Sequence, residues 1–209
     1  MASLFNQPDR TFEPKPCPPE GMHPARLYSI VDLGTHEDTY QGVSTLKHKV
    51  CLTWELYTEP MMDDGRPYVI GKEYTITAGK FGPYIAKTSA LYDTIKTWMK
   101  WDEKDIKIGK LGKLIGQTAL ITVNHEKGKT DPTKVYSKMG PVLPLMKGMT
   151  CPDQINPSIV YELNGDGFDA LPEWQQFKIK KCKELNGGVP PRIREDGTAS
   201  AETHSDIPF

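Results

Sequence analysis

The strongest constraint on the fold is a strict alternation of side-chain character between residues 47 and 57. Apolar side chains recur at every second position of this segment, at Val50, Leu52, Trp54 and Leu56. The positions of opposite parity carry Lys47, Lys49, Cys51, Thr53, Glu55 and Tyr57. Because successive side chains of a β-strand point to opposite faces, this period of two predicts a half-buried strand with Trp54 in the core.

Other segments complete a mainly β pattern. Strands are predicted at 25–33, 68–77, 118–125 and 134–145, where side chains alternate or β-branched and aromatic residues prevail. The polar, glycine-containing segment 34–45 is predicted to be a loop. Between the third and fourth strands, Leu91, Ile95 and Trp98 recur at helical spacing, which predicts a helix within 87–101. Three strands, a helix and two strands is the order of a five-stranded OB-like barrel with an inserted helix, an order that other small barrels share.

The chain is expected to divide into four segments. They are an extended N-terminal arm (1–20), the barrel (21–147), a C-terminal extension (148–186) and a disordered acidic tail (187–209). The arm has five prolines in its first 19 residues, and its composition leaves open whether it is disordered or lies on the domain.

Two elements are predicted in the C-terminal extension. A short strand is expected within 158–163. A terminal helix is expected from Ala170 to about Leu185, with Asp169 as its cap. Its apolar side would carry Leu171, Trp174 and Phe177 or Lys178.

Charge is distributed unevenly along the chain. The formal net charge is −1. The tail 187–209 holds two Arg and four acidic residues, a net of −2, so residues 1–186 sum to +1. The stretch 96–113 contains six Lys against three acidic residues. Such a run is usually a solvated face but is also suited to follow a phosphate backbone, so the composition does not exclude a nucleic-acid ligand.

The sequence lacks the motifs that are typical of several classes of protein. The chain has neither a Gly-x-x-x-x-Gly-Lys-Ser/Thr phosphate loop nor a Gly-x-Ser-x-Gly nucleophile elbow. Its five His and four widely spaced Cys show no metal-ligand spacing, so we expect reduced thiols, no metal and no cofactor. The N-terminus lacks the pattern of a signal peptide, and no apolar stretch of about 18 residues could span a membrane. We therefore expect a non-enzymatic, cytoplasmic protein without a membrane partner.

The most specific motif stands at the C-terminal tip. The chain ends in Asp206, Ile207, Pro208 and Phe209. This ending resembles the tip of bacterial single-stranded DNA-binding proteins, which finish in acidic residues followed by Ile-Pro-Phe. The ring of Phe209 can enter an apolar pocket of a partner while its terminal carboxylate pairs with an Arg. The tail departs from the family pattern in being less acidic, with His204 and Ser205 where further acids are usual.

Short segments of the body carry a second resemblance. They are Ala25-Arg26, Asp32 to Thr35, Thr53 to Glu55, Lys72 to Thr75 and Leu171 to Trp174. They resemble segments of phage replication-region proteins that are taken to be OB-fold single-strand binders. The resemblance spans roughly residues 20–185. It implies an OB fold and binding of single-stranded DNA, but it assigns no residue to the site.

Single-strand binders need cations for the phosphates and exposed aromatic rings on which bases stack. The predicted strands and the loop 78–83 supply both kinds of side chain. The candidates are Lys47, Lys49, Tyr57, Lys72, Tyr74, Lys80, Phe81, Tyr84, Lys134, Tyr136 and Lys138. Core packing is the alternative role for each ring, and the choice stays open for Tyr74, Phe81 and Tyr84.

Together these features predict a protein that coats single-stranded DNA in phage replication or recombination, in the cytoplasm of a host bacterium. Its tip would recruit replication, recombination or repair proteins. One alternative is an interaction protein that uses the tip to sequester or inhibit host repair or defence factors. Another is a small nuclease or other enzyme on the same barrel. Whether the chain forms a homo-oligomer stays open.

Overall fold

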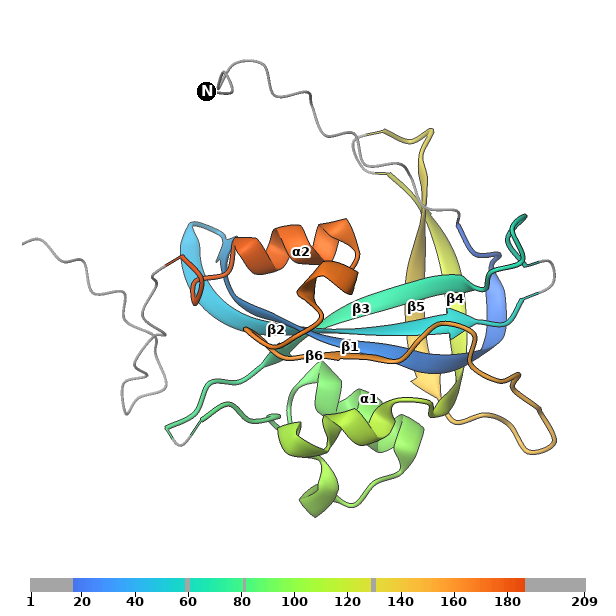
Figure 1. Cartoon of the computed structure of the whole chain (residues 1–209), viewed down its shortest axis with the longest axis horizontal. Helices are drawn as coiled ribbons and strands as arrows, with labels where there is room; N and C mark the ends of the chain where they lie inside the picture. The colour runs from blue at the N-terminus through green and yellow to red at the C-terminus, as the bar shows by residue number, and fades with distance from the viewer. Residues whose placement is uncertain (1–16, 59–60, 81, 129–130, 187–209) are drawn as a thin grey trace, which may run out of the picture.

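The computed structural model describes residues 17–58, 61–80, 82–128 and 131–186 (Figure 1). Six strands form one sheet in the order β3-β2-β1-β4-β5, with β6 beside β1. They are β1 (Gly21–Tyr40), β2 (Val43–Leu56), β3 (Tyr68–Ile76), β4 (Thr118–Lys127), β5 (Val135–Leu143) and β6 (Ile159–Tyr161). All neighbours are antiparallel except β1 and β6, which are parallel. The expectation of a mainly β fold is confirmed.

The sheet is not closed. Strands β3 and β5 form the two ends of the hydrogen-bonded path, and no strand ladder joins them among the described residues. A closed five-stranded barrel is therefore not what the structure shows.

The polar segment 34–45 is a long hairpin and not the predicted loop. Strand β1 runs on to Tyr40, and β2 begins at Val43. The intervening Gln41 and Gly42 have φ of 50° and 80°, and positive φ at both central residues is what a type I′ hairpin turn requires. Polar cross-strand contacts replace apolar ones here. One of them joins the hydroxyls of Thr39 and Ser44 at 2.9 Å.

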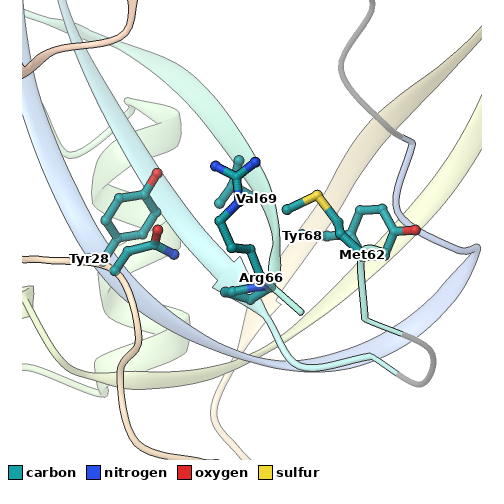
Figure 2. Close-up of a pocket in the computed structure, with 7 residues that line it drawn as sticks. Tyr28, Met62, Arg66, Tyr68 and Val69 are labelled. Carbon is teal, nitrogen blue, oxygen red and sulfur yellow. The ribbon is translucent and has the colours of Figure 1, made fainter. Parts of the chain in front are cut away.

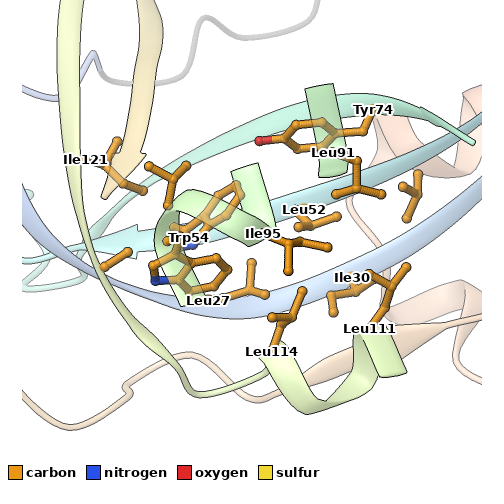
Figure 3. Packing of buried hydrophobic residues seen from close by; sticks show 14 of the residues in the cluster. Leu27, Ile30, Leu52, Trp54, Tyr74, Leu91, Ile95, Leu111, Leu114 and Ile121 are labelled. Carbon is orange, nitrogen blue, oxygen red and sulfur yellow. The ribbon is translucent and has the colours of Figure 1, made fainter. Parts of the chain in front are cut away.

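One hydrophobic core lies between the sheet and helix α1 (Ala90–Met99), as Figure 3 shows. Trp54 is 0% exposed, which confirms its predicted place in the core. Its ring meets that of Trp98 edge-on, with centroids 5.9 Å apart. The Trp98 indole N–H donates to the Thr118 carbonyl at 2.7 Å and so ties α1 to β4. The Ser89 hydroxyl caps the helix by accepting from the Tyr92 amide.

The basic stretch after α1 also contributes to this core. It forms two short 3₁₀ helices, η1 (Glu103–Asp105) and η2 (Ile108–Leu114). Leu111 and Leu114 of η2 are buried under the sheet. The lysines of this stretch therefore lie on the outside of a packed segment, as a solvated face would.

A second core covers the opposite face of the sheet. Helix α2 (Glu173–Lys180) lies on the side away from α1 (Figure 1) and follows η3 (Phe168–Ala170). The buried members of this core are Val31, Leu33, Cys51, Tyr161, Leu171 and Ile179. Every residue of β2 from Val50 to Leu56 is consequently buried. The prediction of a half-buried strand was wrong, because the C-terminal extension covers the face that carries Cys51, Thr53 and Glu55.

Helix α2 is shorter than predicted and turned differently. Its N-cap is Pro172 and not Asp169. The residues that it buries are Gln175 and Ile179, whereas Phe177 is 38% exposed. Leu171 and Trp174 pack against the second core as predicted. The placing of Phe177 on the apolar side was wrong, because Gln175 and Ile179 face the sheet.

Glu55 fixes the extension to the sheet from inside. Its side chain is 0% exposed. It accepts hydrogen bonds from the Ile155 amide at 2.9 Å and from the Asn156 amide and side-chain amide at 2.9 and 2.7 Å. The Tyr57 hydroxyl also donates to it. A buried carboxylate is tolerated only when its oxygens are well supplied with donors, and these contacts supply them.

A second attachment joins the end of the extension to the β1–β2 hairpin. The Glu184 carboxylate accepts from the Thr35 amide at 2.8 Å, and the Lys183 amide donates to the Thr35 carbonyl at 2.9 Å. His48 Nε2 lies 2.8 Å from an oxygen of Asp32, and its Nδ1 lies 3.5 Å from Glu184. The hydrogen bond to Asp32 raises the pKa of His48, and burial opposes this shift.

Replacement of Glu55 by Ala is expected to lower the free energy of unfolding by about 1–3 kcal/mol, because it removes the buried acceptor that holds the amides of Ile155 and Asn156 against the sheet. Urea unfolding followed by circular dichroism measures the change. The matched control is Glu126→Ala, which removes an exposed carboxylate paired with Lys138 and should cost less than about 1 kcal/mol. Equal effects of the two substitutions would contradict the structural role of Glu55.

Candidate nucleic-acid interface

The predicted site residues fall in separate parts of the molecule. Those on β5 and the turn before it form one group, those of the loop after β3 form another, and Lys47 and Lys49 lie on the β1–β2 hairpin. Phe81 lies outside the described residues, as do the tip residues Asp206, Ile207, Pro208 and Phe209. The structure therefore supports several local surfaces and not one continuous strip along the predicted polar faces.

The β4–β5 hairpin presents the best-exposed ring among the candidates. Tyr136 is 55% exposed. Lys134 and Lys138 are two residues away on either side, so their side chains leave the strand on the same face as the ring. Lys138 pairs with Glu126 at 2.6 Å, and Lys134 lies 3.8 Å from Asp131. The hairpin thus holds an aromatic side chain between two cations in contact with solvent.

Residues 17–20 tie this hairpin to the body of the protein. The sulfur of Cys17 lies 3.1 Å from the Ser137 hydroxyl. The carbonyl of Pro18 is 2.8 Å from His125 Nε2, and the His125 amide donates to the Glu20 carboxylate at 2.7 Å. This end of the N-terminal arm therefore lies on the domain, which was one of the two open alternatives, and residues 1–16 fall outside the description.

The loop after β3 holds Tyr84 in a tight backbone arrangement. The amide of Tyr84 donates to the Thr77 carbonyl at 2.8 Å, and the reverse bond is 3.0 Å. Gly79 and Gly82 exchange two backbone hydrogen bonds of 3.1 Å. A Cβ at Gly79 would lie 2.9 Å from the Gly82 carbonyl oxygen and from the Tyr84 ring, so the loop requires glycine there. Tyr84 is 50% exposed, and Lys80 is exposed in the same loop.

Tyr74 is not part of any interface. Its ring is 2% exposed and packs in the core under α1 (Figure 3). Its hydroxyl accepts from the Thr94 hydroxyl at 3.3 Å, and burial raises its pKa to about 12. The prediction that Tyr74 stacks on bases was wrong, because the inward face of β3 could not be identified from its sequence. Lys72 covers this ring, with its ammonium 5.3 Å from the centroid.

The remaining predicted residues make contacts within the protein. Lys49 lies 2.9 Å and Lys47 3.4 Å from the carboxylate of Asp38. The hydrogen bond from Lys49 lowers the pKa of Asp38. The Tyr57 hydroxyl donates to Glu55, and its oxygen lies 3.0 Å from the Asp153 carbonyl oxygen. Burial raises the pKa of Tyr57, and the half-buried ring offers less surface to a ligand than Tyr84 or Tyr136.

Two pockets open on the face of the sheet that carries α2. The larger has a volume of about 320 Å³ and spans the gap between β3 and β5. Its lining is Pro18, Cys51, Thr53, Val69, Ile70, Gly71, Glu73, Ser137 and Trp174. The smaller, of about 250 Å³, is drawn in Figure 2, where Tyr28 and Arg66 face the same space. Val69 lines both pockets, so they are neighbours on this face.

Tyr28, Arg66 and Trp174 line these pockets and were not among the predicted binding residues. Tyr28 lies at the register shift between Leu27 and Ser29 of β1, where it has no partner residue on β2, and such an irregularity interrupts the alternation from which a side chain's face is predicted. Arg66 donates to the Asp64 carboxylate at 2.7 Å in the β2–β3 turn. Trp174 was predicted on the apolar side of the terminal helix, and it does pack against the second core while one part of it lines the larger pocket.

The described His, Cys, Asp and Glu side chains show no arrangement suited to a metal site or a disulfide. Among the described residues, no group of three or more His, Cys, Asp and Glu could hold a metal ion. None of the four cysteines forms a disulfide. Burial raises the pKa of the Cys51 thiol to about 11, which disfavours the reactive thiolate. No helix in the described part of the chain is long and apolar enough to cross a membrane.

Comparison with known proteins assigns no family to the chain. No family model matches its sequence, and no curated protein matches it.

Replacement of Tyr136 by Ala is expected to weaken binding of single-stranded DNA by about 1–3 kcal/mol, because it removes one exposed stacking surface. Fluorescence anisotropy with a labelled oligo-dT measures the affinity. Tyr74→Phe is the matched control, since it alters a ring that no ligand can reach, and its affinity should equal that of the wild type. Unchanged affinity after Tyr136→Ala would remove the β4–β5 hairpin from the interface.

Proposed function

We propose that this chain is a non-catalytic, phage-type single-stranded DNA-binding protein with a partly open OB-like barrel. The order β3-β2-β1-β4-β5, with α1 between β3 and β4, is the arrangement expected of such a barrel. OB folds bind oligonucleotides on the face of the second and third strands and on the loops between strands 1 and 2 and strands 4 and 5. In this protein both loops belong to long hairpins that bear lysines.

The observation that carries the proposal is the exposed Tyr136 between Lys134 and Lys138. A base can stack on the ring while the two ammonium groups meet the phosphates on either side. Tyr84 and Lys80 repeat this combination on the loop after β3. A ring that stacks on any base binds without sequence preference, which suits a protein that coats DNA in replication or recombination.

A preference for single strands follows from the same chemistry. In a duplex the bases are paired and stacked on each other, so their faces are not available to a tyrosine. The rings of Tyr84 and Tyr136 therefore contribute binding energy only when the bases are unpaired. Lysines attract the phosphates of both forms and do not discriminate between them.

A salt titration with poly-dT, duplex DNA and RNA tests this function. The logarithm of the affinity for poly-dT should fall with the logarithm of salt concentration, by about 0.7 for each phosphate neutralised. Poly-dT should bind more tightly than the duplex at every salt concentration. A flat response, or a preference for the duplex, would overturn the proposal, and cleavage of labelled strands in the presence of divalent metal would favour the nuclease alternative.

We further propose that the tip, Asp206 to Phe209, recruits replication, recombination or repair proteins. The support is the sequence of the tip, because these residues lie outside the described structure. Deletion of the four residues should abolish capture of host repair helicases and exonucleases in pull-down experiments, since it removes the ring and the terminal carboxylate together. Affinity for poly-dT should stay equal or rise slightly, most at low salt, because the tail is acidic.

The same deletion separates the two roles of the chain. A truncated protein that keeps its partners would show that the Ile-Pro-Phe ending is a coincidence. Loss of poly-dT binding would place the tail in the DNA site and contradict the division of roles. If the chain binds no DNA with or without its tail, and the tail still captures repair factors, the result would favour the alternative of a protein that sequesters host factors.

A further inference from the structure

Helix α2 exposes the aromatic side chain of Phe177. If core packing alone set the orientation of the helix, this ring would be expected to face the sheet. It buries Gln175, which is 1% exposed, and leaves Phe177 38% exposed. Burial of apolar area stabilises a fold, and burial of an amide costs free energy unless its groups are paired. The Gln175 side-chain oxygen has no hydrogen-bond partner among the described residues. Stability therefore does not explain why the ring points outward.

Rings and lysines pair along η3 and α2, where Phe168 and Trp174 are half-buried against the second core and Phe177 is exposed. Three ammonium groups lie over aromatic rings: Lys181 at 4.0 Å from the centroid of Phe177, Lys180 at 5.4 Å from Phe168 and Lys178 at 5.8 Å from Trp174. Trp174, Phe177 and Lys178 of α2 and its C-cap Lys181 follow the spacing i, i+3, i+4, i+7, which places them on one face of the helix. These six residues are called the ring–lysine stripe below.

Part of the positive charge of this stripe is not neutralised within the protein. Lys178 pairs with Glu73 of β3. Lys180 and Lys181 are exposed and have no carboxylate within 4.0 Å among the described residues. Two such cations beside an exposed phenylalanine are complementary to a ligand that carries both phosphates and flat bases.

The stripe begins at the groove between β3 and β5. Trp174 lines the 320 Å³ pocket together with Gly71 of β3 and Ser137 of β5. Ser137 follows Tyr136 in β5, so the Tyr136 ring leaves the strand on the face opposite to the groove. Because β5 is at the end of the sheet, a strand bound at Tyr136 can pass around β5 to the groove and reach Phe177 one turn beyond Trp174.

We infer that the ring–lysine stripe is a second contact surface for single-stranded DNA, which rests on the proposed function of the chain. Bases stack on Phe177 and Phe168, and Lys180 and Lys181 bind the phosphates. In the absence of DNA each ammonium lies over its ring, and the incoming base takes its place there. The C-terminal extension is then part of the binding surface and does more than cover the sheet.

The test compares substitutions on the two faces of the sheet in the full-length chain. Phe177→Ala should weaken oligo-dT binding about 5- to 100-fold, which corresponds to the loss of one stacked base. The double substitution Lys180→Gln and Lys181→Gln should lower the salt slope by about 1.4, because two phosphates are no longer neutralised and each accounts for about 0.7. The matched control is Lys107→Gln with Lys113→Gln, which removes the same charge from η2 and its N-cap on the side of α1 and should leave the slope unchanged.

Two further measurements separate binding from folding. Phe177→Trp keeps a stacking ring and should bind like the wild type, and circular dichroism with thermal unfolding shows whether each variant is folded. The inference is overturned if folded Phe177→Ala and the Lys180, Lys181 variant bind like the wild type while Tyr136→Ala binds less well. It is also overturned if the η2 control lowers the slope equally, because the effect is then one of total charge. Absence of oligo-dT binding by the wild type itself would instead refute the proposed function.

Discussion

The burial of β1 and β2 on both faces is the constraint on which the rest of this structure depends. One face packs on α1 and η2, and the other is covered by the C-terminal extension. The buried carboxylate of Glu55 holds the extension there through the amides of Ile155 and Asn156. A ligand therefore cannot lie on the middle of the sheet. It is restricted to the hairpins beyond the covered region, to the groove beside β3 and β5, and to the outer side of α2.

Local patterns predicted the parts of the fold that local contacts decide. The alternation around Trp54 predicted β2 and the inward position of its ring, and the spacing of Leu91 and Ile95 predicted α1. Long-range contacts decided the rest. Cys51 and Glu55 look solvent-facing in the alternating pattern because nothing in β2 itself shows that a segment 100 residues later covers them. The hairpin in 34–45 was missed because its strands pair through polar side chains, which the search for apolar alternation cannot detect.

The candidate site residues show the same division between what local patterns predict and what long-range contacts decide. Tyr136 was identified from its own strand, since it lies at the start of β5, where Val135 and Lys138 are exposed as well. Tyr74 was misassigned because α1 covers its face of β3, and this depends on a helix that follows it in the chain. The ring–lysine stripe was missed for the converse reason. An aromatic residue on a short helix is usually core, and only the packing of Gln175 against the sheet turns Phe177 outward.

The nearly neutral charge of the chain is compatible with a polyanionic ligand because of where the acids lie. Lys138 and Lys134 are paired with Glu126 and Asp131 on an exposed hairpin. Exposed ion pairs contribute only about 0–1 kcal/mol, so a phosphate can replace the carboxylate at small cost. Glu55, by contrast, is buried and takes its hydrogen bonds from amides and a hydroxyl, so it opposes no phosphate at the surface. The net charge counts these two kinds of carboxylate equally, but only an exposed one competes with DNA for a lysine.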